Sequence, residues 1–227
     1  MPTMAEAWQE LQEFTAFVRE CNAEFLFEFS PGQSLEDVQA EYQDKLYGYM
    51  ADYLQGSKSV VIDRNKYNRA INDAFTFAFV AGWADAGASG PITAEAQSWL
   101  NGRIAQEVQF ANTLFADLKA LRADKEIPME DKLSAAQMHA EAYTNTLTGV
   151  YAQGKMMGEP ERDGEWEYGD TDHCDTCAGL NGKVHPMSWY LDNGYIPQEA
   201  GSSTLDCGGW KCQCIIKDPK TGEQLIP

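Results

Sequence analysis

Basic residues are scarce in this chain. Its 227 residues include 17 Lys and Arg against 35 Asp and Glu, which gives a formal net charge of −18 at pH 7. Nucleic acids and anionic membrane surfaces both attract proteins through Lys and Arg. The composition therefore argues against a sequence-independent nucleic-acid binder. We expect no sequence-specific nucleic-acid contact and no membrane partner, and the acidity favours protein partners.

Long apolar runs are also missing. The richest stretch, residues 74–83, has only about half the length that a bilayer crossing requires. Residues 1–7 show neither the basic start nor the apolar core of a secretory signal. We therefore expect the protein to mature in a reducing cytoplasm, where clustered cysteines are more often metal ligands than disulfides.

Residues suited to acid–base catalysis are few. Three histidines in the whole chain offer little choice for proton transfer near neutral pH. The glycine-containing segment 179–183 is too short for a phosphate-binding P-loop, and no Ser or Thr follows its lysine. Abundant carboxylates are expected as solvated faces in so acidic a chain, so none of them marks a catalytic site.

Helical periodicity dominates residues 4–157, where apolar side chains recur at steps of three and four. Five such stripes run from Trp8 to Phe25, Val38 to Tyr53, Tyr67 to Trp83, Ile104 to Leu121 and Leu133 to Val150. Stripes of this kind are typical of core positions, and Cys21 on the first stripe is predicted to be a buried thiol.

Breaks between the stripes define the predicted helices. Pro31 and Gly32 interrupt the chain, and Ser34 with Asp37 predicts a capped helix start. Residues 87–91 end the third helix, and Pro128 begins a fifth whose core side runs from Leu133 to Val150. We predict a mostly α protein in which residues 1–157 form an elongated antiparallel helical bundle.

Composition changes at Gly158, after which Gly, Asp, Pro and Asn are frequent and helical periodicity ends. Segments 165–168, 214–217 and 223–226 have the alternation or β-branched content of short strands. This part is too short and polar to build a large core by itself. Residues 158–227 are therefore predicted to form a small zinc-knuckle α+β module.

Cysteines supply the reason to expect zinc. Five of the six lie in the last quarter of the chain, as Cys174 and Cys177 in a CxxC turn and Cys207, Cys212 and Cys214 in a Gly-rich segment. Two such turns separated by a loop are the usual layout of a tetrahedral zinc site. Four thiolates leave zinc no open coordination position, so the predicted Zn²⁺ is structural and the chain is predicted not to be an enzyme.

The second cluster offers three thiols for two remaining ligand positions. Our first choice of ligands is Cys174, Cys177, Cys207 and Cys212, and Cys214 either substitutes for one of them or packs beneath the site. If residues 212–216 form a strand, Cys212 and Cys214 share a face. His173 and His185 lie nearby and could each replace a thiol, although a solvent-facing loop histidine is the simpler interpretation.

A zinc-dependent nucleobase deaminase is the enzyme alternative. Such enzymes carry an H-x-E motif followed by P-C-x-x-C, and this chain has His139 and Glu141 ahead of Cys174 and Cys177. Against this alternative, residue 173 is His rather than Pro. His139 and Glu141 also lie in a predicted helix, where positions two apart diverge by about 200°. A deaminase site would leave the second cysteine cluster without a role.

The order of motifs resembles that of a known family. The helical part ends in small and polar segments at 144–149 and 151–154, and the elements that follow are a strand with Trp166, DHCDTCAGLNGK at 172–183, a spacer with Pro197, and LDCGGWKCQCII at 205–216. This pattern is similar to the C-terminal part of the minor head morphogenesis proteins of tailed bacteriophages, the Mu F-like group. The resemblance covers residues 140–217, and upstream it rests on helical character and residues 79–86.

One departure from the family pattern bears on the metal site. Many relatives carry His-Pro-x-Cys-Arg-Cys, whereas here Cys207 and two glycines stand in place of the histidine and Gln213 replaces the arginine. The choice among Cys207, Cys212 and Cys214 for the remaining ligands therefore stays open.

The resemblance implies a bacteriophage minor capsid protein with a structural zinc, present in several copies around the portal. It would act in head morphogenesis and in DNA packaging or ejection, with the portal protein and other capsid proteins as partners. Its location would be the virion, in the capsid interior or at the portal vertex, after assembly in the host cytoplasm. The deaminase remains a second hypothesis, and a non-virion adaptor that binds proteins through its helices remains a third.

Overall fold

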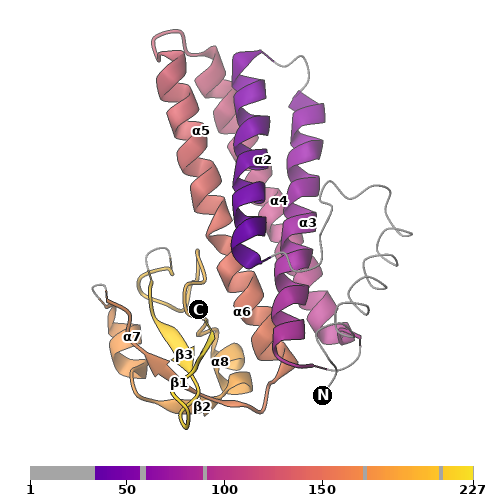
Figure 1. Cartoon of the computed structure of the whole chain (residues 1–227). Coiled ribbons are helices and arrows are strands. Elements are labelled where there is room, and N and C mark those ends of the chain that lie inside the picture. The colour runs from indigo at the N-terminus through magenta and orange to yellow at the C-terminus, as the bar shows by residue number, and fades with distance from the viewer. Residues whose placement is uncertain (1–33, 57–59, 89–90, 171–172, 210–211, 227) are drawn as a thin grey trace. The chain divides into compact units, whose positions relative to one another are not determined.

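The computed structural model describes residues 34–56, 60–88, 91–170, 173–209 and 212–226. The described residues form two compact units. The helical unit comprises the described parts of 34–76 and 97–144, and the cysteine-rich unit those of 77–96 and 145–226. The protein is mostly helical and has a small antiparallel four-stranded sheet near its C-terminus, which confirms the predicted fold class at this level (Figure 1).

Four helices contribute to the helical unit: α2 (Leu35–Gln55), α3 (Val60–Asp85), α4 (Ala94–Ala123) and α5 (Met129–Thr144). The ends of α3 and α4 extend into the cysteine-rich unit. Helix α2 begins as predicted, because the Asp37 N–H donates to Ser34 Oγ at 3.1 Å and the Ser34 N–H donates to Asp37 Oδ2 at 3.0 Å. The stripe from Trp8 to Phe25, with Cys21, lies outside the described residues.

Aromatic side chains join these helices in one core. Phe115 of α4 meets Tyr53 of α2 and Tyr67 of α3 edge to face, with ring centroids 6.1 and 5.4 Å apart. Tyr67 also meets Tyr143 of α5 at 6.2 Å. Such edge-to-face pairs add stabilisation beyond the apolar area that they bury. The apolar stripes of α2 and α3 are buried as predicted, so these helices pack through their apolar faces.

The fifth predicted helix is two helices. The prediction of one helix from Pro128 through Val150 is wrong, because α5 ends at Thr144 and α6 (Thr146–Gly158) begins after Asn145. Thr144 Oγ1 donates to the carbonyl of Ala140 at 2.8 Å, a back-bond that bends helices. Asn145 nevertheless keeps near-helical backbone angles, so the apolar periodicity continues across the break and hides it in the sequence.

The sheet of the cysteine-rich unit has the order β2-β1-β3-β4, with every neighbouring pair antiparallel. Its strands are β1 (Asp163–Glu167), β2 (Val184–Pro186), β3 (Ile215–Lys217) and β4 (Gln224–Ile226). Strands β1, β3 and β4 confirm the three predicted segments to within two residues at each end. Strand β2 and the short helices α7 (Asp175–Leu180) and α8 (Met187–Asn193) were not predicted.

Trp166 lies at the centre of this unit's core. It is fully buried and pairs across the sheet with Ile216, which in turn pairs with Ile226. Tyr190 of α8 packs beside Trp166, and its hydroxyl donates to the carbonyls of Gly164 and Lys183 at 3.1 and 2.9 Å. The core therefore holds the strand that precedes the first two cysteines and the helix that lies between them and the last three.

Helix α6 shares that core. Ala152 and Met156 are buried with Trp166, and α6 contacts both α8 and β4. On its other side, α6 meets α3 backbone to backbone: a Cβ added at Gly154 would lie 2.1 Å from the Phe79 carbonyl, and one at Gly82 would lie 2.1 Å from the Tyr151 carbonyl. The predicted boundary at residue 158 falls inside this compact unit, and the division into folding domains at that point stays a prediction.

Candidate metal centre

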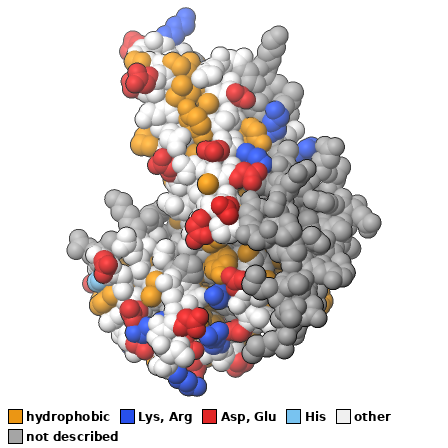
Figure 2. Space-filling model, viewed as in Figure 1, with side chains coloured by type: hydrophobic (Ala, Val, Ile, Leu, Met, Phe, Trp, Pro, Cys, Tyr) orange, Lys and Arg blue, Asp and Glu red, His pale blue; other side chains and the backbone are white. Residues whose placement is uncertain are grey.

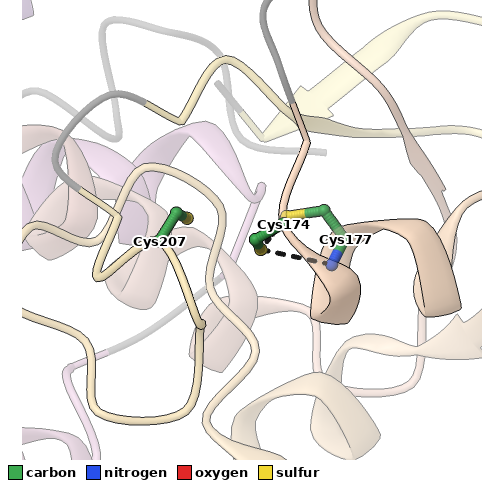
Figure 3. A group of neighbouring side chains, drawn as sticks. All are labelled: Cys174, Cys177 and Cys207. Carbon is green, nitrogen blue, oxygen red and sulfur yellow. Dashed lines mark hydrogen bonds between the residues drawn. The ribbon is translucent and has the colours of Figure 1, made fainter.

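The first cysteine turn, residues 174–177, opens α7. Cys174 is the N-cap of this helix, and its sulfur accepts the Cys177 N–H at 3.5 Å. The one-turn spacing places the two sulfurs 3.3 Å apart. Cys207 approaches from a loop on the opposite side (Figure 3). The CxxC turn therefore delivers two thiols to one point, as the sequence predicted.

All five cysteines of the C-terminal region converge in two overlapping groups. Cys174, Cys177 and Cys207 form one group, and Cys177, Cys212 and Cys214 form the other. Within each group the sulfurs lie no more than 4.8 Å from one another. A tetrahedral zinc with Zn–S bonds of about 2.3 Å spaces its sulfurs about 3.8 Å apart. Each group is thus close to the spacing that a metal ion requires, and Cys177 belongs to both.

In the second cysteine turn, residues 207–214, none of the described residues belongs to a helix or strand. Strand β3 begins only at Ile215, so Cys212 and Cys214 do not share a strand face as the conditional prediction required. Gly209 shapes the turn, because its φ of +74° favours glycine and an added Cβ would lie 1.9 Å from the Glu199 carbonyl. After the first turn, Gly182 has a positive φ of 72°, whereas Gly179 lies within α7.

Backbone N–H groups point at four of the five sulfurs. Cys174 accepts from Cys177 and Cys207, while Cys207 accepts from Gly209. Cys212 accepts from Gln198 and Cys214, while Cys214 accepts from Gly169. Amide donors of this kind stabilise negative charge on sulfur and fix the orientation of the ligand. These N–H groups therefore favour negative charge on the sulfurs that they reach.

Each group contains one thiol whose pKa is lowered. Burial acts to raise the pKa of Cys174, but hydrogen bonds from Cys177 and Cys207 outweigh it and lower the pKa to about 7. The thiol of Cys212 donates to Cys214, which lowers the pKa of Cys214. The pKa of Cys212 is raised by that same donation, and burial raises the pKa values of Cys177 and Cys207. The protein therefore shares protons among neighbouring sulfurs, and a cation could replace them.

The described cysteines form no disulfide. All five are free thiols, and the 3.3 Å between Cys174 and Cys177 is far longer than an S–S bond of about 2.05 Å. Of the described residues, only these cysteines form groups of three or more metal-ligating side chains, so the cysteine clusters could hold a metal ion.

The neighbouring histidines take part in ring stacks. His173 is exposed and stacks on Tyr168, with ring centroids 3.7 Å apart. His185 in β2 stacks on Trp189 at 3.7 Å and is half-buried. Neither histidine belongs to a cysteine group. A stacked aromatic neighbour therefore accounts for the position of each histidine ring.

The deaminase residues do not join the cysteines in a common group. His139 and Glu141 are both exposed on α5, and Glu141 accepts a hydrogen bond from Gln137 on the same helix at 3.1 Å. They belong to the helical unit, whereas Cys174 and Cys177 belong to the cysteine-rich unit. No potential metal group among the described residues contains either of them.

The acidic side chains on the face shown in Figure 2 are not gathered in one patch. On the visible face, Asp and Glu side chains lie scattered over the described residues, with Lys and Arg among them (Figure 2). None of the described helices combines the length and apolar character that a bilayer crossing needs.

Comparison with family models, with curated proteins and with solved structures found no match to this chain.

Proposed function

We propose that the five converging thiols hold one structural Zn²⁺. The observation that carries this proposal is the pair of three-thiol groups sharing Cys177, with backbone N–H groups directed at the sulfurs. Thiolates select soft or borderline ions, and a closed tetrahedral site of four sulfurs is typical of structural zinc. Catalytic zinc keeps a water and uses histidine or carboxylate ligands, which the two groups lack.

The proposed ligands come from both groups. Cys174, Cys177, Cys207 and Cys212 remain the first choice, because they take two thiols from each turn and leave the buried Cys214 to support Cys212. Replacement of either Cys207 or Cys212 by Cys214 would also give four sulfurs. With Zn²⁺, four thiolates carry a net charge of −2, which the surrounding N–H groups offset.

The proposed zinc would join two cysteine turns that lie far apart in the sequence. The first cysteine turn begins α7, and the second leads into β3. Between β2 and β3, α8 is the regular element among the residues that the structure describes. Because a structural zinc contributes folding free energy directly, it would fix these loops around the small sheet as a zinc-knuckle module. The site thus serves architecture rather than catalysis.

The biological role that we propose is that of a bacteriophage minor head protein. Its support is the motif order over residues 140–217, which resembles the Mu F-like group, together with a thiol cluster suited to a knuckle at the matching positions. In this role the protein would bind the portal and neighbouring capsid proteins and act in head morphogenesis and DNA packaging or ejection. It would reside in the virion, and its acidic surface would not adhere to packed DNA.

We further propose that the helices form an elongated antiparallel bundle available to protein partners. Helix α4 alone has 30 residues and so spans about 45 Å. A non-virion adaptor would use such helices as well, so the experiment must separate the two roles.

Association with a portal protein is the experiment that separates them. The full chain is co-expressed with the portal protein of the same phage genome, and portal rings are isolated by size. Co-purification of zinc-loaded protein with the rings, and its presence in purified particles, are expected. Absence from both rings and particles would contradict the head-protein role but leave the zinc proposal standing.

A further inference from the structure

Two side chains outside the sulfur cluster connect the cysteine turns directly. Asp206 Oδ2 accepts the Thr176 N–H at 2.9 Å and the Thr176 hydroxyl at 2.6 Å. Thr176 Oγ1 in turn accepts the Asp206 N–H at 3.4 Å. Three hydrogen bonds thus link Thr176 in the first turn to the residue before the second turn, although the two residues are 30 positions apart in the sequence.

This link lies next to three of the proposed zinc ligands. Thr176 lies inside the first turn, between Cys174 and Cys177, and Asp206 immediately precedes Cys207. The Cys207 N–H donates to the Cys174 sulfur, and these two sulfurs lie within 4.8 Å of each other. A shift of Asp206 would therefore move Cys207 away from Cys174.

A contribution to folding stability alone does not explain the three hydrogen bonds between Thr176 and Asp206. Asp206 is exposed, and hydrogen bonds on an exposed surface compete with water. Thr176 donates both its hydroxyl and its backbone N–H to one carboxylate oxygen of Asp206, at 2.6 and 2.9 Å. An ionised acceptor makes the stronger kind of hydrogen bond. The link is thus set to hold the two turns together when the thiols bind a cation.

We propose that Asp206 and Thr176 form a positioning clasp that holds Cys207 beside Cys174 before the metal arrives. This inference rests on the proposed zinc site and names the residues that pre-organise it. Neither residue is a ligand, because Asp206 Oδ2 already accepts two hydrogen bonds and neither side chain belongs to a three-ligand group. Outer-shell partners of this kind typically change metal affinity by about 10- to 100-fold.

The test uses the full chain, with Zn²⁺ affinity measured by competition with a chromophoric chelator. Asp206→Ala and Thr176→Val are each expected to weaken Zn²⁺ binding by about 10- to 100-fold. Asp206→Asn retains an acceptor oxygen and is expected to recover most of the affinity. Asp175→Ala is the matched control, since Asp175 is an exposed carboxylate beside Thr176 that lies outside the clasp, and its affinity should stay within about threefold of wild type.

A second readout separates positioning from general destabilisation. With Co²⁺ in place of zinc, the sulfur-to-cobalt charge-transfer absorbance per ion counts bound thiolates. We expect it to fall in Asp206→Ala and Thr176→Val, while far-UV circular dichroism of the helices stays unchanged. The double variant should bind no more weakly than the weaker single variant, because both changes break one link.

Each outcome decides one claim. Wild-type zinc affinity and cobalt absorbance in both clasp variants would overturn the clasp and leave the zinc site intact. A wild-type chain that binds no zinc would overturn the zinc site and the clasp together. If Asp206→Ala fails to fold, Thr176→Val and Asp206→Asn still decide between the two.

Discussion

Replacement of Cys177 by Ser is expected to weaken metal binding more than any other single Cys→Ser change in the cluster. Cys177 is the only thiol common to both groups. Without it, Cys174 and Cys207 remain as one pair and Cys212 and Cys214 as another, and no three sulfurs stay within 4.8 Å. Loss of Cys207 instead leaves Cys177 with three other thiols. The five cysteines are therefore unequal even though each offers one sulfur.

The magnitude follows from the energy of zinc binding to thiolate sites. Structural zinc contributes about 10–16 kcal/mol in small finger peptides, which is about 2.5–4 kcal/mol for each of four ligands. At 1.4 kcal/mol per tenfold, loss of a shared ligand corresponds to a decrease in affinity of about 60- to 700-fold. Loss of Cys214 alone should cost less, about tenfold, because the four first-choice ligands remain and Cys214 acts only as their support.

Zinc affinity of the five single Cys→Ser variants, measured by chelator competition, is the assay. Cys177→Ala serves as a second variant, because a buried serine hydroxyl could disturb the core that Cys177 joins. Equal losses in all five variants would show that the cluster does not centre on Cys177. Unchanged affinity in Cys177→Ser would refute the reasoning outright.

Three other predictions follow from the fold and the site. Gly82→Ala should destabilise the cysteine-rich unit by about 3 kcal/mol, since the added Cβ would lie 2.1 Å from the Tyr151 carbonyl. Gly102→Ala, on an open face of α4, is the control and should be neutral or stabilising. Chemical denaturation of both variants measures the difference, and equal free energies of unfolding would contradict the prediction. Burial raises the pKa of Glu107 above its usual 4.5 despite Arg103 beside it. As pH rises past 4.5, the folded chain therefore keeps a proton that the unfolded chain has lost, and the free energy of unfolding should fall relative to that of Glu107→Gln. Parallel pH profiles of the two proteins would contradict this prediction. Chelation of zinc should remove amide-exchange protection from residues 160–226 and weaken it in α6, which shares their core. Most of the helical circular dichroism should persist, because the helical unit has its own buried core. Complete loss of helicity would show that the two units do not fold separately.

Much of the helical architecture could be predicted from periodicity, because α2 and α3 bury one continuous apolar stripe each. Helix α4 departs from this rule. Ile104 and Val108 on its predicted stripe are only half-buried, and Glu107 is buried between them, paired with Arg103 at 2.8 Å. A stripe pattern assigns charged residues to solvent, so it could not predict a carboxylate that is buried with its partner.

Short elements escaped prediction for a different reason. Helix α7 has six residues and α8 has seven, too few to show a repeating stripe. Capping signals could have found α8, because Pro186 precedes it and Gly194, in a left-handed conformation, follows it. Strand β2 has three residues and ends in Pro186, which an edge strand tolerates.

The candidate site was predicted as a set of residues but not as a geometry. CxxC spacing alone places Cys174 beside Cys177, since four residues of a helical turn fix their separation. The sharing of Cys177 between two groups depends on how residues 195–214 fold back, and no local pattern encodes that path. The Asp206–Thr176 link was missed because an exposed Asp and an exposed or half-exposed Thr are common in loops and give no signal of their own.

X-ray absorption at the zinc edge of the purified full chain tests the central claim most directly. We predict one zinc per chain with four sulfur neighbours at about 2.3 Å and no oxygen or nitrogen in the first shell. A shell with an oxygen from water or a histidine nitrogen, or a zinc-free chain whose cysteines are paired as disulfides, would contradict the account.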